Sequence, residues 1–219
     1  MLEAHAGVAC SRRRPRVPIK RLKIALVLLA LVAGVASAQI LNSERIEQTF
    51  GSYGINVAFS DESLRISNLF SWHEGRTITR TLAIVAYPQV VDAAFASVHE
   101  QILAGGSIGA TFQAAGWQVG KRNLDIREIP LPQAFAAPME VDAPETPLAT
   151  HIYQLDIAKD GQSFHYATIV ELHHPDYLTT AELAEIYPLE KEPAPEEVWA
   201  GLTVLTLGLA QIERLQPER

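Results

Sequence analysis

The sequence has little cysteine, and outside its first 23 residues it has little positive charge. Its single cysteine is Cys10, so no disulfide can form within the chain. A disulfide-held scaffold is therefore excluded, and the core has to come from hydrophobic residues. These make up 48% of the sequence, which is too much for a wholly disordered chain.

Positive charge is concentrated at the start of the chain. Seven of the 18 Lys and Arg residues lie before residue 24, together with only one of the 25 acidic residues, Glu3. The rest of the chain has 11 basic and 24 acidic residues, a net charge of −13. A surface that binds nucleic acid needs clustered Lys and Arg. We therefore expect no nucleic-acid partner.

Residues 1–38 have the three parts of a signal peptide. A basic region precedes an apolar run of about a dozen residues at 24–35, and the small residues Ala36-Ser37-Ala38 follow. The run is shorter than the roughly 20 residues that span a bilayer. We expect cleavage after Ala38 and a periplasmic or secreted protein. The alternative is an uncleaved N-terminal anchor. Cleavage would also remove Cys10, which suits an oxidising compartment.

Turn residues and hydrophobic periodicity divide residues 39–187 into short elements. The expected helices are 44–50, 91–103, a short one after Ser107 and one that starts near Thr180. The expected strands are 55–59, 64–70, 77–87, 117–129, 151–158 and 163–173. Six strands joined mostly by hairpins predict an α+β domain, with an antiparallel sheet of about six strands and a helix pair. The five prolines at 130–147 predict a surface excursion with one helical turn.

The pair Asp160-Gly161 lies between two alternating runs and predicts a two-residue hairpin turn. Counting outward from this turn pairs Lys159 with Gln162, Ile157 with Phe164, Leu155 with Tyr166 and Tyr153 with Thr168. The face that carries Ile157, Leu155 and Tyr153 is apolar, so we expect it to pack on the helices.

The same count places three ionisable residues on the opposite face: Glu171, His173 and His165. There, Asp156 lies across from His165 and predicts an exposed ion pair. Alternate residues of a strand are roughly 6.5–7 Å apart, so Glu171 and His173 are close enough to share one ion or one substrate. The spacing offers no third ligand, so we predict no metal site. We expect a solvated or hydrogen-bonded histidine pair there instead.

Residues 188–219 form a C-terminal linker and an apolar helix. Pro193 and Pro195 mark the linker, and the helix is expected from Glu196-Glu197 to about Leu215. Its centre is apolar nearly all round, which predicts burial. The helix is expected to pack on its own domain, to bind a partner or to associate with a membrane. Membrane contact is thus expected only through this helix or an uncleaved N-terminus.

A glycine-rich turn lies between the two central helices. Ser107 in Gly105-Gly106-Ser107-Ile108-Gly109 does not have the spacing or the preceding strand of a nucleophile elbow. A turn of this kind exposes backbone N–H groups, which favour an anion such as a carboxylate. Packing of the helix pair explains the glycines equally well.

Three segments together resemble chorismate lyase and the related ligand-sensing UTRA domains. The first is the glycine turn through Phe112, which follows a strand ending at Pro88 and a helix. The second is Glu171-Leu172-His173-His174-Pro175, which follows the Asp160-Gly161 turn. The third is Leu64-Arg65. The resemblance covers roughly residues 55–178. The insertion at 130–147 and the C-terminal helix lie outside it, and His173 and His174 replace apolar residues.

The resemblance implies a cofactor-free lyase that splits chorismate into 4-hydroxybenzoate and pyruvate. Arg65 and the backbone at Ile108 would bind a carboxylate, and Glu171, with a raised pKa, would transfer a proton. Additional site candidates are Arg80, Gly106, Ser107 and His173. Chorismate is made in the cytoplasm, whereas this chain has an export signal. We therefore expect a protein that binds a small aromatic carboxylic acid, without a cofactor and without need of catalysis. An active lyase and an envelope interaction module are the alternatives.

Overall fold

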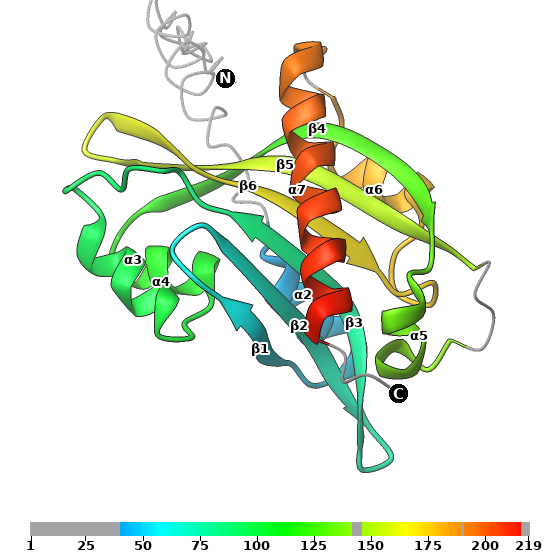
Figure 1. The fold of residues 1–219 in the computed structure, drawn as a ribbon. Helices are drawn as coiled ribbons and strands as arrows, with labels where there is room; N and C mark the ends of the chain where they lie inside the picture. The colour runs from blue at the N-terminus through cyan, green and yellow to red at the C-terminus, as the bar shows by residue number, and fades with distance from the viewer. Residues whose placement is uncertain (1–39, 142–145, 190, 216–219) are drawn as a thin grey trace, which may run out of the picture. The chain divides into compact units, whose positions relative to one another are not determined.

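The computed structural model describes residues 40–141, 146–189 and 191–215, and their fold is α+β (Figure 1). The described strands form an open antiparallel sheet in the order β1-β2-β3-β6-β5-β4. They are β1 (Gly54–Ser60), β2 (Leu64–His73), β3 (Arg76–Ala86), β4 (Gln118–Pro130), β5 (Pro147–Lys159) and β6 (Gln162–His173). The expected α+β class and the antiparallel sheet of six strands are confirmed. The segment interpreted as a signal peptide, 1–38, lies outside the described residues.

The helices follow the expected order, with two corrections. They are α2 (Asn42–Phe50), α3 (Ala96–Leu103), α4 (Ile108–Ala114), α5 (Gln133–Met139), α6 (Thr180–Ile186) and α7 (Pro195–Leu215). The prediction that the second helix starts at 91 was wrong. The carboxylate of Asp92 accepts a hydrogen bond from the Ala94 amide at 2.8 Å, and this local turn competes with helix at that point.

The second correction concerns the proline-rich segment, which is more than a surface excursion. It contains α5, whose Phe135 and Met139 are buried in the core. Leu131, just before α5, is buried with them. The prolines therefore shape a connection that covers one end of the sheet.

Helices cover both faces of the sheet. On one face, α7 and α5 pack on Leu82, Ile84 and Ile152. On the other face, α3 and α4 pack on the part of the sheet that carries Val85 and Ile169. Helices α2 and α6 cover the neighbouring part of that second face through Ile46 and Leu183.

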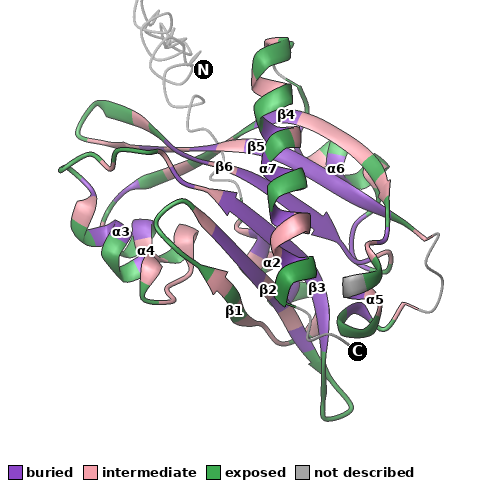
Figure 2. Cartoon of the chain, viewed as in Figure 1, coloured by how far each residue is buried: buried purple, intermediate pink, exposed green. Residues whose placement is uncertain are grey.

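Helix α7 packs on its own domain, which is the first of the three roles that the sequence leaves open. Val204, Leu205 and Ile212 are buried against the sheet. Gly201 and Gly208 allow the close approach, because a Cβ on Gly201 would overlap Ile152 and a Cβ on Gly208 would overlap Ile84. The expectation of burial all round was wrong. Figure 2 shows exposed positions along this helix, and they include Trp199, Leu207 and Leu215. No helix among the described residues is long and apolar enough to cross a membrane.

The β5–β6 hairpin has the expected turn but not the expected faces. Lys159 pairs with Gln162 and Ile157 with Phe164, as predicted. A bulge then leaves Tyr166 without an opposite residue, so that Leu155 pairs with Ala167 and Tyr153 with Ile169. The extra residue reverses which side chains point to each face.

The expectation that Glu171 lies on the face opposite to Tyr153 was therefore wrong. Glu171 pairs with His151 and lines the same cavity as Tyr153 and Leu155. Only the positions before the bulge keep the predicted arrangement. There, Asp156 Oδ1 lies 3.3 Å from His165 Nδ1 across the hairpin, in an exposed contact that is an ion pair when His165 is protonated.

Candidate functional site

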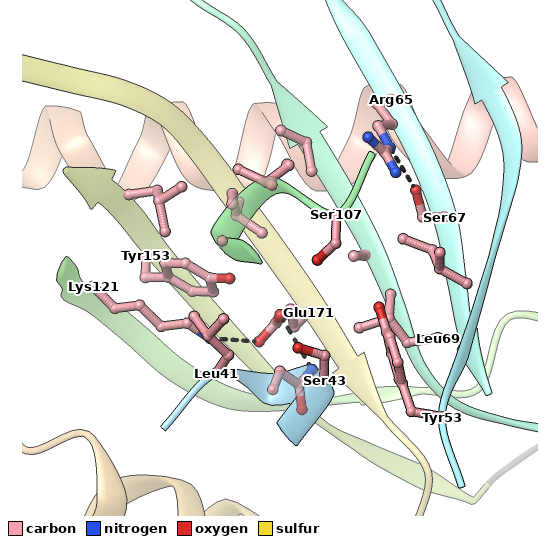
Figure 3. A pocket seen from close by; sticks show the side chains of 18 residues that line it. Leu41, Ser43, Tyr53, Arg65, Ser67, Leu69, Ser107, Lys121, Tyr153 and Glu171 are labelled. Atoms are coloured by element: carbon pink, nitrogen blue, oxygen red, sulfur yellow. Dashed lines mark hydrogen bonds and ion pairs between the residues drawn. The ribbon is translucent and has the colours of Figure 1, made fainter. Parts of the chain in front are cut away.

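A small cavity lies between the sheet and the helices α2 and α4 (Figure 3). Its volume is about 80 Å³. Arg65, Ser107, Ile108 and Glu171, all candidates from the sequence, line it together. Gly106, Arg80 and His173 do not line it. The segments that resemble chorismate lyase thus meet at one place, although they are far apart in the sequence.

Arg65 forms one end of the cavity. It lies on β2 and is buried, with only 1% of the residue exposed. Nε donates to Ser67 Oγ at 2.9 Å. Nη1 donates to the carbonyl oxygens of Ile102 and Gly106 at 2.9 and 2.8 Å. Arg65 therefore also ties the C-terminal end of α3 and the glycine turn to the sheet.

No carboxylate among the described residues lies within ion-pair distance of Arg65. Its Nη2 atom is buried and has no hydrogen bond of acceptable geometry within the described chain. The buried hydroxyls of Tyr53 and Tyr87 lie nearby, the first close to Ser107 and the second close to Arg65. Burial raises the pKa of both tyrosines, which the positive charge of Arg65 opposes. This end of the cavity therefore holds a buried cation without a carboxylate partner in the described chain and, from Tyr53, a buried hydroxyl group.

The glycine turn shapes the wall beside Arg65. A Cβ on Gly106 would lie 2.8 Å from Thr111 Oγ1 and 2.9 Å from the Gln101 carbonyl oxygen. Glycine is therefore needed there for the carbonyl of Gly106 to reach Arg65. Ile108 is the first residue of α4. This helix has seven residues, so its N-terminus adds little to the binding of an anion.

Glu171 and Lys121 form the other end of the cavity. Lys121 Nζ lies 3.2 Å from Glu171 Oε2, and the two side chains are 7% and 6% exposed. Asn42 Nδ2 donates to Glu171 Oε1 at 3.2 Å, and Tyr177 Oη donates to Asn42 Oδ1 at 2.6 Å. The ammonium of Lys121 also lies over the Tyr153 ring, 4.3 Å from its centroid. Figure 3 shows Lys121 reaching across the strands toward Glu171.

These contacts keep Glu171 ionised. Burial opposes ionisation, but the opposing effects, of which the charge of Lys121 is the largest, outweigh it and lower the pKa of Glu171 to about 2. For Lys121, burial is likewise outweighed by Glu171, and its pKa is raised. The expectation of a raised Glu171 pKa is therefore wrong. At neutral pH this carboxylate accepts hydrogen bonds and is not a proton donor.

The two histidines next to this pair are buried and neutral. His173 Nδ1 lies 3.0 Å from Thr81 Oγ1, and its Nε2 lies 3.9 Å from Glu171 Oε2. His151 stacks on Tyr187, with ring centroids 4.5 Å apart. Burial lowers the pKa of His173 to about 4 and that of His151 well below its usual value. His173 thus lies beside Glu171 and does not line the cavity.

Arg80 lies outside the cavity. Its Nε donates to Ser71 Oγ at 2.9 Å, and its guanidinium lies over the Phe50 ring, 3.9 Å from the centroid. Because these contacts involve no cavity-lining residue, Arg80 has a structural place in the fold. It provides a matched comparison for Arg65.

Sequence reasoning missed Lys121, Asn42 and Tyr53. The alternation of β4 contained a signal for Lys121, because Trp117, Val119 and Lys121 alternate and the first two are apolar. A lysine at the third position of such a series is expected on the buried face. Asn42 carried no comparable signal, since its contacts with β3 and β6 depend on how α2 packs.

No group of three or more His, Cys, Asp or Glu residues in the described chain is arranged to hold a metal ion. The chain matches no protein-family model, and a search of curated proteins finds no match. The function is therefore inferred from the fold and the cavity.

Proposed function

We propose that the protein is an exported binding protein for a small aromatic carboxylic acid, built on a chorismate-lyase-like layout. Arg65 would bind the carboxylate, and the hydroxyls of Tyr53 and Ser107 would complete that end. The apolar side chains between Arg65 and Glu171 would enclose the ring. No cofactor is part of the proposal.

The observation that carries this proposal is the buried cation of Arg65. Placing a charge in a protein interior is costly unless it is paired. Ile102, Gly106 and Ser67 satisfy part of the guanidinium, but they bring no negative charge. An anionic ligand in the cavity would supply the missing charge and a partner for Nη2. A carboxylate fits best, since Arg binds it with directed hydrogen bonds.

The size and walls of the cavity limit the ligand. Its volume of about 80 Å³ is well below the roughly 300–1,000 Å³ of pockets for drug-sized molecules. Between the two charged ends, the walls include Leu69, Val85, Leu155 and Ile169. Strand spacing puts the Cα atoms of Arg65 and Glu171 about 12 Å apart, two strands and two residues from each other. Two side chains projecting into that space leave room for one ring.

The catalytic alternative is weaker. Protonation of a leaving oxygen needs an acid whose pKa lies near the working pH. Glu171 is held ionised by Lys121, and its pKa of about 2 does not suit that role. The proposal is therefore a binding protein that releases its ligand unchanged. Incubation with chorismate tests the alternative, because an active lyase would release 4-hydroxybenzoate.

The binding test is calorimetric titration and thermal shift with benzoate and 4-hydroxybenzoate. A ligand that binds only the folded protein raises its apparent stability. Arg65→Ala should reduce the affinity by about 2–5 kcal/mol, because it removes the only charge offered to the carboxylate at that end. Glu171→Gln should leave most of the carboxylate affinity intact.

The matched control is Arg80→Ala, which removes a second buried arginine of β2–β3 that does not line the cavity. It should bind benzoate as the unchanged protein does. If benzoate binds and Arg65→Ala leaves its affinity unchanged, the assigned carboxylate site is wrong.

Export is a separate part of the proposal and needs its own test. It rests on the basic region, the short apolar run and Ala36-Ser37-Ala38. Intact-mass analysis of protein from its native host should give a chain that begins at Gln39. A mass that includes residues 1–38 would contradict cleavage and favour the N-terminal anchor.

A further inference from the structure

Lys121 has no place in the chorismate-lyase resemblance, yet it forms the ion pair at the cavity's inner end. It reaches from the edge strand β4 across β5 to Glu171 on β6. Its ammonium lies 4.3 Å from the centroid of the Tyr153 ring and 5.1 Å from that of Tyr187. Moving an ammonium group out of water costs free energy, so a buried lysine indicates a specific role.

We infer that Lys121 is a positioning residue for ligand selection: its ion pair fixes Glu171 as a carboxylate, so that the inner end of the cavity selects ligands with a hydrogen-bond donor. This inference rests on the proposed carboxylate site at Arg65. The inference also specifies a chemical group of the ligand. At the end opposite to its carboxylate, the ligand must carry a hydrogen-bond donor.

An ionised carboxylate offers about four lone-pair sites and no donor. Lys121 and Asn42 each take a site on Glu171, and the Tyr153 hydroxyl lies close to the same carboxylate. The remaining acceptor capacity faces a cavity with apolar walls. A ligand atom that reaches it has to donate a hydrogen bond, because an acceptor there would meet a buried negative charge.

Other charged and titratable groups surround Glu171 and do not replace Lys121 in this role. They are His151 and Tyr153 on β5, His173 on β6, Tyr177 after β6, Tyr187 at the end of α6, and Tyr53 and Arg65 across the cavity. The two histidines are neutral near pH 7 because burial lowers their pKa values. Burial keeps Tyr153 and Tyr177 protonated by raising their pKa values. Lys121 is thus the cation in direct contact with Glu171 in the described chain.

The test compares 4-hydroxybenzoate with 4-fluorobenzoate, which are similar in size but differ in the donor. The full chain should bind the hydroxyl compound about tenfold more tightly, as expected for one hydrogen bond to a charged group. This ratio should stay constant from about pH 5 to pH 8, because Glu171 remains ionised over that range. A ratio near one, or one that falls as the pH drops through this range, overturns the inference.

Variants of Lys121 add the readout that separates positioning from simple stability. Lys121→Met removes the ammonium, so burial then raises the pKa of Glu171. The ratio should approach one at about pH 5 and recover as the pH rises and Glu171 ionises. Lys121→Arg keeps the positive charge and should preserve the ratio. If Lys121→Met folds and keeps the ratio at every pH, the inference is wrong.

The matched control is Lys159→Met. Lys159 also lies near an aromatic ring, 5.7 Å from the centroid of Trp117, but it binds the Ala115 carbonyl oxygen away from the cavity. It should leave the ratio unchanged. If Lys121→Met does not fold, the pH profile of the unchanged protein still decides. If neither benzoate binds, both the function and this inference fail. If both bind equally, only the inference fails.

Discussion

The two ends of the cavity solve the problem of a buried charge in different ways. At one end, Lys121 and Glu171 pair at 3.2 Å, and Asn42 and aromatic rings complete the arrangement. At the other end, Arg65 is just as deeply buried, but only neutral oxygen atoms of the described chain contact its charge. The charges of the first end are paired within the protein, whereas no carboxylate of the described residues pairs with Arg65 at the second.

Under the proposed function, this difference assigns affinity for the ligand to one end and selection between ligands to the other. An unpaired cation gains most from a ligand, because the ligand removes the cost of leaving the charge uncompensated. A paired carboxylate gains less, but it discriminates between groups that donate and groups that only accept hydrogen bonds. Substitutions at one end at a time separate these two roles.

The largest loss of stability should come from breaking the ion pair of Lys121 and Glu171. Lys121→Met leaves the Glu171 carboxylate buried without its partner and should lower the free energy of unfolding by about 3–5 kcal/mol. The double variant with Glu171→Gln should recover part of this loss, because no unpaired charge remains. Urea unfolding near pH 7 measures both.

Arg76→Met is the control for that measurement. Its pair with Glu140 has a similar distance, 3.0 Å, but the side chains are 61% and 35% exposed. Solvent screening should limit its loss to less than about 1 kcal/mol. A similar loss in Arg76→Met and Lys121→Met would contradict the importance of burial.

The end with Lys121 and Glu171 should also make the protein sensitive to acid. The pKa of His173 is about 4 in the folded protein, against an ordinary value of 6.5. Unfolded chains therefore take up the proton first, and stability falls as the pH drops from about 6.5 to about 4, by on the order of 3 kcal/mol. Glu171, with its lowered pKa of about 2, adds a further loss below about pH 4.5. Urea unfolding at several pH values measures this, and His173→Gln should show a smaller loss between pH 6.5 and pH 4.

Substituting Arg65, at the other end, should lower the free energy of unfolding by less when no ligand is present. Arg65→Met loses three hydrogen bonds, but it also removes an uncompensated buried charge. We expect a loss of about 1–3 kcal/mol in the absence of ligand, and no stabilisation by added benzoate. Thermal unfolding with and without benzoate measures both. Equal stabilisation of the variant and the unchanged protein would place the ligand elsewhere.

The sequence predicted the sheet well because its signals are local. The Asp160-Gly161 turn depends on neighbouring residues, and it was found in the structure with the predicted pairing next to it. The bulge at Tyr166 depends on how the hairpin fits against the helices. Tyr166 packs on Phe95 and Phe112, with ring centroids 5.7 and 4.6 Å away. No alternation pattern encodes such a fit, so the predicted faces of Glu171 and His173 were wrong.

The cavity was predicted in part for a similar reason. Arg65, Ile108 and Glu171 came from a resemblance between short motifs, and the fold brings them to one cavity. Their electrostatics could not be derived in the same way. The pKa of Glu171 is decided by Lys121, which lies 50 positions earlier in the sequence on a strand that is not its neighbour in the sheet. Only the packed sheet shows that the two side chains meet.

The smallest effect is expected for the exposed contact between His165 and Asp156 on the β5–β6 hairpin, which is an ion pair when His165 is protonated. His165 Nδ1 lies 3.3 Å from Asp156 Oδ1, close to the distance in the Lys121–Glu171 pair, but the two side chains are 42% and 36% exposed. Water screens such a pair, and two exposed side chains lose freedom when they form it. Asp156→Asn should therefore change the free energy of unfolding by about 0.2–1 kcal/mol, and added salt should reduce the difference further. Urea unfolding of the variant at low and high salt measures this, next to Lys121→Met, whose loss should persist in salt because its partner is shielded from ions. A loss for Asp156→Asn as large as that for Lys121→Met would mean that distance, and not burial, decides the strength of these pairs.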